Sequence, residues 1–344
     1  MSDELPGLDL ARLRTYLDEH APGLVTGELT ATLIQGGRSN LTYDVSDGER
    51  SLVVRRPPMG HVLATAHDMG REHRVISALA TTDVPVPAAY LHCSDEEVLG
   101  APFYVMDKVD GTAYRHAAEL AALGPDRTRK ICEQLVDTLA ELHTVDPAAV
   151  GLADFGRPEG FLARQVSRWK KQLDSSRSRE IAGIDDLYAY LESHVPEQSA
   201  PAVVHGDFRL DNVLVDDSGA ITAVLDWEMA TLGDPLTDIA LMVAYQQMAE
   251  HAGSGAVADA PLADGYLAVD DVLARYGERS GRDLSEMGFY LALAYFKLAI
   301  ILEGIHYRYN QGQTVGEGFK GIGLMVEPLV AGGLAATRTT HRPS

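Results

Sequence analysis

The residues best suited to chemistry lie in one run, His-Gly-Asp-Phe-Arg-Leu-Asp-Asn at 205–212, which is followed by Asp226. Four residues separate Asp207 from Asn212. This spacing suits phosphoryl transfer, in which one carboxylate accepts the proton of an attacking hydroxyl while an amide and a second carboxylate bind magnesium. We therefore predict that Asp207 is the general base and that Asn212 and Asp226 are Mg²⁺ ligands, since Mg²⁺ prefers oxygen donors.

Two short apolar runs, residues 213–215 and 223–225, lie between Asn212 and Asp226. They are separated by Asp-Asp-Ser-Gly at 216–219, a sequence typical of turns. The pattern predicts a β-hairpin that delivers Asp226 beside Asn212.

Nearby residues are expected to support this site. We expect His205 to brace the loop through hydrogen bonds and Gly206 to allow a tight backbone. Asp234 and Asp238 surround Pro235 at the start of an expected helix, where carboxylates favour the positive end of the helix dipole. We therefore expect both to cap that helix.

The composition is that of a globular protein, with 344 residues, 46% hydrophobic residues and 23% charged residues. This length allows a large core and favours two lobes over one. The formal net charge of -21 argues against nucleic acids and anionic membranes as partners, because both attract clustered Lys and Arg.

The remaining composition signals concern the compartment. Cys93 and Cys132 are the only cysteines and show no pairing or zinc-binding pattern, which indicates a reducing cytoplasm. The N-terminus lacks a signal segment. The longest apolar stretch, 289–305, contains Lys297 and Glu303 and falls short of roughly 20 uninterrupted apolar residues, so it predicts a buried helix rather than a membrane span.

The first third of the chain has an α+β pattern, with turn signals between short segments. Helices are expected over 8–20 and 70–81, and strands over 29–33, 42–45, 51–55 and 103–107. From Asp126 onward apolar residues recur at helical spacing, which predicts a mainly helical second part. The further helices are expected over 126–146, 161–173, 184–194, 235–249, 266–279 and 284–309, and the change of pattern places a lobe boundary near 109–111.

Taken in order, these motifs resemble the aminoglycoside phosphotransferase and choline kinase-like superfamily. The residues that carry the resemblance are Gly36-Gly37-Arg38-Ser39-Asn40, Val53-Val54-Arg55, Glu72, Tyr104-Val105-Met106, Leu142-His143, His205 to Asp207, Asn212 and Asp226. Leu225 to Glu228 and Gly233 to Asp238 resemble the branch related to the kinase-like module fused to some acyl-CoA dehydrogenases.

The resemblance implies a protein-kinase-like two-lobed α+β fold. Residues 1–107 would form a small N-terminal lobe with an antiparallel sheet that binds nucleotide. Residues 108–344 would form a larger, mainly helical lobe that carries catalysis and binds an acceptor alcohol. ATP or GTP with Mg²⁺ is the implied co-substrate.

Gly36, Gly37, Ser39 and Asn40 lie between two predicted strands. Missing side chains there would let backbone N–H groups approach phosphate oxygens, and Ser39 would add a hydroxyl. The alternative is a plain hairpin turn.

Arg55 occupies the strand position at which many relatives carry the lysine that contacts nucleotide phosphates, and Glu72 is its expected ion-pair partner. Arginine keeps the charge but is planar and bulkier, so its phosphate geometry must differ. Arg56 competes for this role, although strand alternation directs it to the opposite face. Either arginine could instead be a solvated edge residue.

Met106 and Lys108 fall at the expected connection between the lobes, where backbone groups would bind the purine edge. Glu228 stands where the protein-kinase Asp-Phe-Gly motif has glycine, so a regulatory flip of that segment is not assumed.

These features predict a small-molecule kinase that moves the γ-phosphoryl group of ATP or GTP to an alcohol. The sequence leaves the acceptor open among an aminoglycoside, a hydroxyacyl thioester and another metabolic alcohol, and the resemblance to the acyl-CoA dehydrogenase-linked branch favours a metabolic acceptor. It also leaves open the oligomeric state, a homodimer included. The alternative is a catalytically silent nucleotide- or ligand-binding module, while a protein kinase is disfavoured because an Ala-Pro-Glu ending is absent.

Overall fold

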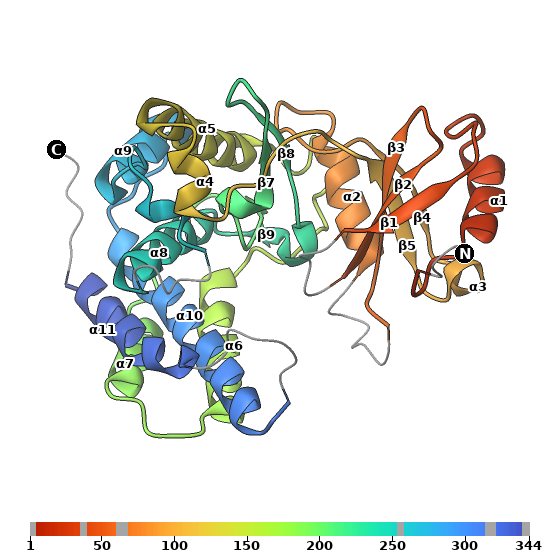
Figure 1. Ribbon diagram of the computed structural model, residues 1–344. Coiled ribbons are helices and arrows are strands. Elements are labelled where there is room, and N and C mark those ends of the chain that lie inside the picture. Colours follow the sequence, from red (N-terminus) through yellow and green to blue (C-terminus); the bar gives the residue numbers. More distant parts are fainter. Residues whose placement is uncertain (1–4, 35–39, 60–67, 253–257, 314–320, 339–344) are drawn as a thin grey trace. The chain divides into compact units, whose positions relative to one another are not determined.

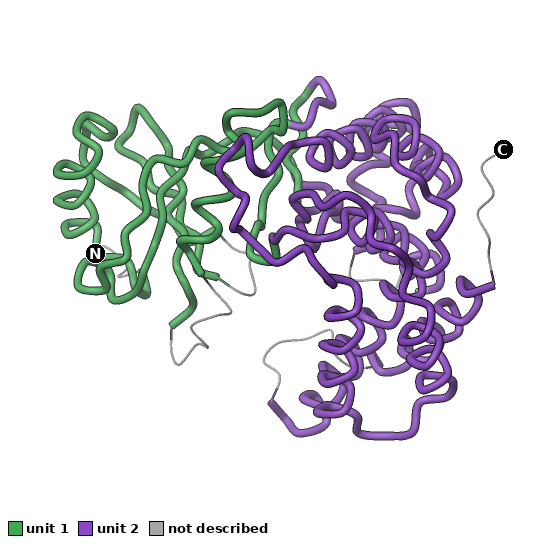
Figure 2. Tube along the Cα trace, turned by 180° about the vertical axis from the view of Figure 1, so that it is seen from behind, with its two compact units in different colours: residues 1–112, 213–217, 222–230 green, residues 113–212, 218–221, 231–344 purple. Residues whose placement is uncertain are grey.

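The structure is a computed structural model that describes residues 5–34, 40–59, 68–252, 258–313 and 321–338 (Figure 1). The chain forms two compact units, coloured separately in Figure 2. Unit 1 comprises residues 1–112, 213–217 and 222–230, and unit 2 comprises residues 113–212, 218–221 and 231–344. The predicted boundary between residues 107 and 108 remains a prediction. Unit 1 also takes in most of the hairpin that follows the run 205–212, so the chain passes between the units more than once.

Unit 1 is built on a five-stranded antiparallel sheet in the order β1-β2-β3-β5-β4. The strands are β1 (Thr30–Leu33), β2 (Leu41–Ser46), β3 (Ser51–Arg56), β4 (Ala89–Cys93) and β5 (Phe103–Asp107). The helices are α1 (Leu10–His20), α2 (Met69–Leu79) and α3 (Glu96–Leu99). The core beneath the sheet combines Leu13 and Leu17 of α1 with Val45, Val54 and Val105 of the strands.

Most of these elements agree with the predicted ranges, and β5 has the predicted bounds. β4 was not predicted from the sequence. It follows Pro85 and Pro87, which read as breakers, and its pairing with β5 is irregular between Ala89 and Leu91. A short irregular strand gives too weak a two-residue alternation to be recognised alone.

The predicted hairpin is present as a two-stranded sheet of β7 (Val213–Val215) and β8 (Ile221–Val224). Within unit 1 it is anchored at both strands. Thr112 and Val215 exchange backbone hydrogen bonds of 2.8 and 3.0 Å, and Val224 N–H donates to Pro85 O at 2.8 Å. The short 3₁₀ helix η2 (Trp227–Met229) follows the hairpin.

Unit 2 is mainly helical, as the sequence predicted. Its helices are α4 (Ala117–Ala121), α5 (Pro125–Thr144), α6 (Phe161–Ser176), α7 (Ile184–Ser193), α8 (Leu236–Ala252), α9 (Val269–Ser280), α10 (Met287–Asn310) and α11 (Val326–Ala336). Short pieces complete it: the strands β6 (Ala202–Val204) and β9 (Thr231–Gly233), which pair antiparallel, and the 3₁₀ turns η1 (Leu210–Asn212), η4 (Ala260–Leu262) and η5 (Ile322–Met325).

α10 is the central helix of unit 2. It packs against α6, α7, α8 and α11, and it is apolar on all sides, as expected for a helix surrounded by others. By length and composition it is the one described helix that could cross a membrane, but 78% of its apolar window is buried inside the structure. This burial confirms the predicted buried helix.

Candidate active site

The run 205–212, called the catalytic loop after its predicted role, forms a loop of unit 2 that begins where β6 ends. Gly206 adopts a left-handed conformation with φ of 86°, which a side chain would strain, so glycine is required here as predicted. His205 is fully buried, and its Nδ1 accepts a hydrogen bond from the Asp207 N–H at 3.2 Å. His205 therefore braces the loop, as expected.

Asp238 of α8 holds the backbone of this loop. Its Oδ2 accepts from His205 N–H at 2.7 Å, and its Oδ1 accepts from Gly206 N–H at 2.8 Å. The carboxylate is 1% exposed, so these charge-assisted bonds form away from water, where they are strongest. Asp238 lies in the first turn of α8, as expected, but the expectation that it caps this helix is wrong, because its oxygens hydrogen-bond to the loop and to His143.

A buried histidine completes the support. His143 of α5 places Nε2 3.3 Å from Asp238 Oδ2 and Nδ1 2.7 Å from the Tyr276 hydroxyl. Burial would raise the pKa of Asp238, but its bonds to His143 and the loop lower it overall. Burial lowers the pKa of His143 although Asp238 opposes this. The result is an ionised carboxylate kept in place behind the catalytic loop.

Asp234 has the capping role that the sequence suggested. Its Oδ1 accepts from Leu236 N–H at 3.1 Å at the start of α8. Its Oδ2 accepts from the Tyr290 hydroxyl at 2.9 Å and from Ser199 N–H at 3.0 Å. The two acids that surround Pro235 thus differ in role although they share one helix start.

Asp207 and Asn212 are brought together within unit 2. Asn212 Nδ2 donates to the backbone oxygen of Asp207 at 2.8 Å and to its Oδ2 at 3.1 Å. The side chain of Asp207 is 30% exposed, so the carboxylate can be reached by a substrate. Because the amide nitrogen of Asn212 is bonded to Asp207, its side-chain oxygen is the atom suited to bind a cation.

Further side chains of unit 2 surround Asp207. Tyr245 of α8 hydrogen-bonds to it, and burial together with the Asp207 charge raises the pKa of Tyr245. Lys297 of α10 donates to Gly206 O at 3.1 Å. Burial lowers the pKa of Lys297 although Asp207 and Asp238 oppose this. The loop is therefore held from α8 and α10.

In unit 1, Arg55 of β3 joins α2 to the segment after the hairpin. Its Nε lies 3.0 Å from Glu72 Oε2, and its Nη2 lies 2.5 Å from Asp226 Oδ1. Its side chain is only 13% exposed. The predicted pairing of Arg55 with Glu72 is thus present, and a second pairing with Asp226 accompanies it.

Glu72 is the most buried acid of this group. Tyr104 donates its hydroxyl to Glu72 Oε2 at 3.0 Å, and Asn40 Nδ2 contacts Glu72 Oε1 at 3.4 Å and Glu228 Oε2 at 3.2 Å. Burial outweighs the Arg55 charge and raises the pKa of Glu72 to about 7. Burial by itself would lower the pKa of Arg55. The surrounding acidic side chains raise it by more, so the net change is a rise. The guanidinium therefore stays charged.

Asp226 has an unusual backbone. With φ of 64° and ψ of 57°, it is the one non-glycine residue with positive φ in the described part of the chain. Such strain is uncommon outside glycine and tends to occur at functional sites, because surrounding structure must enforce it. Here the adjoining Trp227 is buried and donates Nε1–H to Val224 O at 3.0 Å, which ties the turn to β8.

Arg56 has a different role from Arg55. It is 3% exposed, and its Nη1 donates to the carbonyl oxygens of Gly7 and Leu99 at 2.6 and 2.7 Å. Neither arginine is a solvated edge residue. Strand alternation directs Arg55 to the acidic cluster and Arg56 to the backbone near α1 and α3.

The remaining predicted nucleotide-site residues are less constrained by the structure. Met106 lies within β5 and is buried. Lys108 N–H donates to Ser51 O at 3.3 Å, and its Nζ lies 2.6 Å from Asp44 Oδ2. Gly36, Gly37 and Ser39 lie outside the described residues.

The structure divides the predicted residues between the two units. Unit 1 brings together Arg55, Glu72, Asp226 and Asn40, and unit 2 brings together Asp207 and Asn212. Among the described residues no group of three or more His, Cys, Asp or Glu side chains could by itself hold a metal ion. An amide oxygen and a carboxylate nevertheless suit Mg²⁺, which retains waters and binds substrate phosphates.

Several supporting residues were missed from the sequence. In the sequence Lys297 only interrupts an apolar stretch, although a lysine in a buried helix signals a specific partner. His143 is part of the family resemblance, which assigns it no role. Neither spacing nor composition indicated that Asp238 reaches the loop.

Comparison with known proteins identifies the family. The sequence model of the phosphotransferase enzyme family matches residues 30–282, which include β3, the catalytic loop and Asp226. The chain belongs to this family. Acyl-CoA dehydrogenase family member 11 of Rattus norvegicus is 34% identical over 342 residues, which are 96% of this chain and 44% of the rat protein. The chain thus spans less than half the length of the curated relatives it matches first.

Solved structures agree with this family. The crystal structure of a "putative aminoglycoside phosphotransferase" from Ralstonia eutropha has a TM-score of 0.84 and 32% identity, covering 97% of this chain and 99% of that one. An ethanolamine kinase of Plasmodium vivax has a TM-score of 0.60 at 15% identity, covering 92% and 86% of the two chains, which shows the fold alone. The predicted kinase-like α+β fold and the predicted resemblance are confirmed, and a small-molecule phosphotransferase is supported.

Proposed function

We propose that this phosphotransferase moves the γ-phosphoryl group of ATP or GTP to the hydroxyl of a small molecule. The observation that carries the proposal is the pairing of a substrate-accessible Asp207 with Asn212 on a loop held by a buried carboxylate. This arrangement suits a general base whose position is fixed before the acceptor arrives.

Asp207 would accept the hydroxyl proton of the acceptor. Asn212 and Asp226 would hold Mg²⁺, which neutralises charge on the phosphate oxygens when bound. The ion pair that Arg55 makes with Asp226 involves the Oδ1 atom of that carboxylate. The amide oxygen of Asn212 and a carboxylate oxygen of Asp226 are hard donors of the kind that Mg²⁺ prefers.

The nucleotide would bind to unit 1. Arg55 would contact phosphate oxygens, with Glu72 and Asn40 fixing its position, and Gly36, Gly37 and Ser39 would approach the phosphates. Backbone groups of Met106 and Lys108 would bind the purine edge. Solved structures of the same fold contain GDP or ATP, which supports a nucleoside triphosphate without choosing between them.

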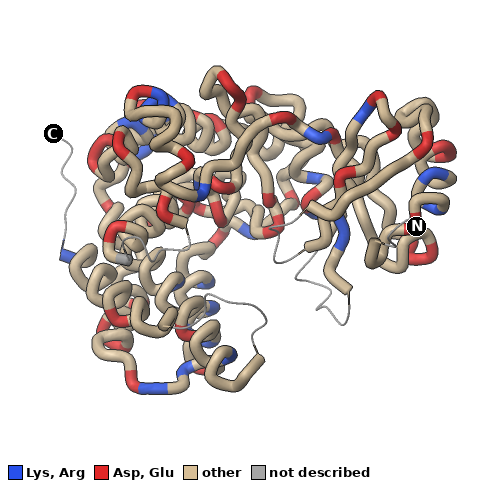
Figure 3. Tube along the Cα trace, viewed as in Figure 1, with Lys and Arg blue, Asp and Glu red and all other residues tan. Residues whose placement is uncertain are grey.

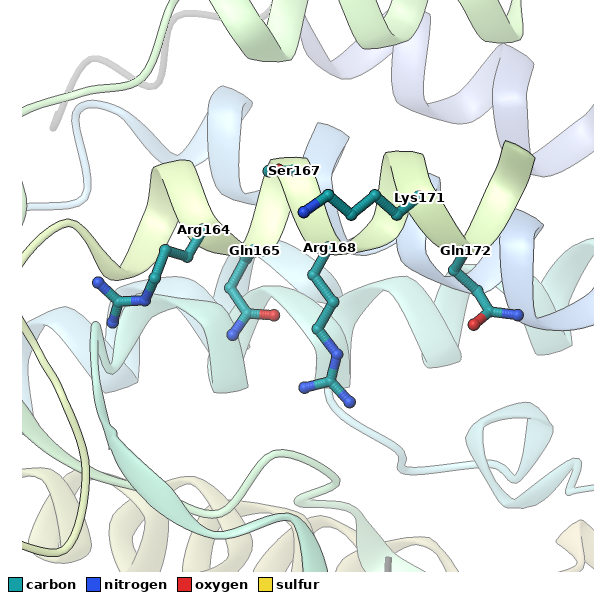
Figure 4. Close-up of a pocket in the computed structure, with 6 residues that line it drawn as sticks. All are labelled: Arg164, Gln165, Ser167, Arg168, Lys171 and Gln172. Carbon is teal, nitrogen blue, oxygen red and sulfur yellow. The ribbon is translucent and has the colours of Figure 1, made fainter. Parts of the chain in front are cut away.

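The acceptor is proposed to be a metabolic alcohol that carries negative charge. α6 bears Arg164, Arg168, Lys170 and Lys171 against one acid, Asp174, although the chain as a whole has a net charge of -21 (Figure 3). Arg164, Arg168 and Lys171 are among the residues that line a hollow of about 550 Å³. Figure 4 shows these side chains on α6.

One residue of this cationic surface, Arg168, acts on a side chain that contacts the catalytic loop. Burial lowers the pKa of Lys297 and the charge of Arg168 adds a smaller lowering, while Lys297 donates to Gly206 O. A hydroxyacyl thioester with an anionic carrier would match such a surface better than a cationic aminoglycoside. We also propose a reducing, cytoplasmic setting, in keeping with the buried free thiols of Cys93 and Cys132.

The test is a screen of Mg-ATP and Mg-GTP against hydroxyacyl thioesters, simple alcohols and kanamycin. Nucleotide consumption and a phosphorylated acceptor would be measured together by mass spectrometry. We expect one anionic alcohol to be phosphorylated and kanamycin to be inert. Phosphorylation of kanamycin alone would contradict the charge argument, and nucleotide binding with no product from any acceptor would contradict the proposal.

The second candidate is the silent binding module, which one observation favours. Arg55 lies 2.5 Å from the carboxylate that should hold the metal, so the guanidinium neutralises Asp226 without any ion. Such a module would bind nucleotide equally well with and without Mg²⁺. Titration calorimetry in magnesium and in EDTA separates the two functions, because the kinase should lose most of its nucleotide affinity in EDTA.

A further inference from the structure

Arg209 lies two residues after Asp207, and its guanidinium is fixed on two sides within unit 2. Its Nη2 lies 2.5 Å from Asp211 Oδ2, and the guanidinium carbon lies 4.8 Å from the centre of the Tyr245 ring. The side chain is 25% exposed. An ion pair and a cation–π contact together hold a planar group in one orientation.

The Nε atom of Arg209 has no hydrogen-bond partner in this arrangement. The atom is also buried. Asp207 Oδ2 is 3.9 Å away, which is too long for a hydrogen bond. A buried charged donor without an acceptor is costly and calls for an explanation, such as a ligand that supplies the acceptor.

Space for such a ligand exists next to Arg209. A cavity of about 80 Å³ is lined by Arg209, Tyr245, Tyr266 and Met242, among others. The cavity can hold a small group beside Arg209 and Asp211 of the catalytic loop.

We propose that Arg209 is a second catalytic residue, whose Nε–H donates to an oxygen of the phosphoryl group while that group passes to the acceptor. The proposal rests on the proposed function. In the reaction the acceptor oxygen forms a bond to the γ-phosphorus, and the bond from that phosphorus to the β,γ-bridging oxygen breaks. The bridging oxygen keeps the electron pair as the nucleoside diphosphate leaves, and Asp207 takes the acceptor proton.

The geometry explains why arginine suits this position. Asp211 engages one end of the guanidinium, and the planar fork then holds Nε–H in a defined direction. A lysine could keep the ion pair with Asp211 through its single nitrogen, but it has no second donor nearer the backbone. Arg209→Lys therefore removes the proposed contact while it keeps the charge and the tether.

The alternative role of Arg209 is purely structural, as a clamp on the loop through Asp211. Arg115 provides the matched control, because its Nε also lies near Asp211 Oδ2, at 3.4 Å. If Asp211 only needs cations around it, Arg209→Lys and Arg115→Lys should behave alike.

The experiment compares wild type, Arg209→Lys, Arg209→Ala and Arg115→Lys by three measurements. The first is the rate of phosphate release from Mg-ATP and Mg-GTP. The second is the dissociation constant of Mg-ADP alone. The third is the dissociation constant of Mg-ADP with aluminium fluoride, which mimics the phosphoryl group during transfer. We expect Arg209→Lys to lower turnover about 10²-fold and to weaken the aluminium fluoride complex, while binding of Mg-ADP alone and Tm stay unchanged. Added guanidinium should restore part of the activity of Arg209→Ala.

The outcomes separate this inference from the proposed function. Wild-type turnover with an unaffected Arg209→Lys variant would overturn the inference alone. The inference would also be overturned if Arg209→Lys weakened Mg-ADP binding and lowered Tm as much as it lowered turnover. Failure of added guanidinium to restore activity to Arg209→Ala would overturn it too. A purely structural clamp on the loop predicts both results. Absence of turnover in the wild type with either nucleotide, both alone and with every acceptor of the screen above, would overturn both the inference and the proposed function.

Discussion

The predicted site residues of unit 1 and those of unit 2 are held by different forces. In unit 1, Arg55 is surrounded by the side chains of Glu72, Asp226 and Glu228, so charged groups hold one another. In unit 2, Asp238 grips backbone N–H groups of the catalytic loop. The charged side chains of unit 1 can change partners when a ligand brings new charge. The hydrogen bonds of Asp238 in unit 2 instead fix the conformation of the main chain.

This difference suits the division of work in phosphoryl transfer. A nucleotide and its cation add several charges when they bind, so ion pairs that can be redistributed are an advantage where they bind. A general base must instead be placed before the reaction, since catalysis depends on its position relative to the attacking hydroxyl. The predictions below break these two arrangements in turn.

The largest effect is expected at the base itself. Asp207→Asn keeps the shape of the side chain but removes its basicity, so turnover should fall by about 10² to 10⁴. Affinity for Mg-nucleotide should change little, because Asp207 is not among the expected nucleotide ligands. Steady-state rates and calorimetry check both statements, and unchanged turnover would remove Asp207 from the mechanism.

The second effect tests the hydrogen bonds between the Asp238 carboxylate and the backbone of the loop. Asp238→Ala should lower the free energy of unfolding by about 4 kcal/mol, because it leaves the His205 and Gly206 N–H groups and His143 without their buried partner. Denaturant titration measures this loss. Asp186→Ala, an exposed acid in the first turn of α7, serves as control and should cost about 0.5 kcal/mol or less. Equal losses of unfolding free energy in the two variants would show that the hydrogen bonds of Asp238 to the loop add no stability.

The third effect tests the buried acid of unit 1 through pH. The pKa of Glu72 is about 7 in the folded protein, against an ordinary value of 4.5. Between these values the folded protein keeps a proton that the unfolded chain has lost, so the free energy of unfolding should fall as the pH rises. The whole shift corresponds to about 3 kcal/mol.

Glu72→Gln provides the control for this pH dependence. The variant cannot ionise, so the decline between pH 4.5 and pH 7 should flatten when unfolding is followed at a series of pH values. A decline of the same steepness in wild type and variant would assign it to other groups.

The smallest effect is expected for Arg55→Lys. Lysine can contact a phosphate or one carboxylate, but it cannot reach Glu72 and Asp226 with separate nitrogens as Arg55 does. Nucleotide affinity should therefore change by less than about tenfold, or about 1.4 kcal/mol. Arg56→Lys is the matched control, since Arg56 binds the carbonyls of Gly7 and Leu99, and it should leave nucleotide affinity unchanged. A much larger loss in Arg55→Lys would show that the two-acid contact is essential for binding.

Much of the fold could be predicted because its signals are local. The long helices of unit 2 show apolar residues at helical spacing, and β2, β3 and β5 are β-prone runs between turns. The elements that were missed are short or lack such a pattern. β6 and β9 have three residues each, and α11 is so apolar that it shows no polar face.

The candidate site was partly predictable for a related reason. Asp207, Asn212 and Asp226 lie close in sequence around one hairpin, so their spacing could be recognised. Asp238 and Tyr245 come from one helix, and Lys297 comes from another. Their relation to the loop depends on how α8 and α10 pack.

The sequence by itself determined the family, the kind of reaction and the residues of the central run, because these depend on residue types at short, fixed intervals. Only the tertiary structure decided that Asp238 supports the loop rather than caps its helix, and that Arg55 joins two acids while Arg56 binds carbonyl oxygens. The physical reason is that neighbouring residues in the sequence do not distinguish these roles. An acid in the first turn of a helix looks the same whether it caps the helix or supports a loop, and an arginine on a strand looks the same whether it pairs with acids or binds carbonyl oxygens. Their partners lie far away in sequence, and packing alone brings them within hydrogen-bonding distance.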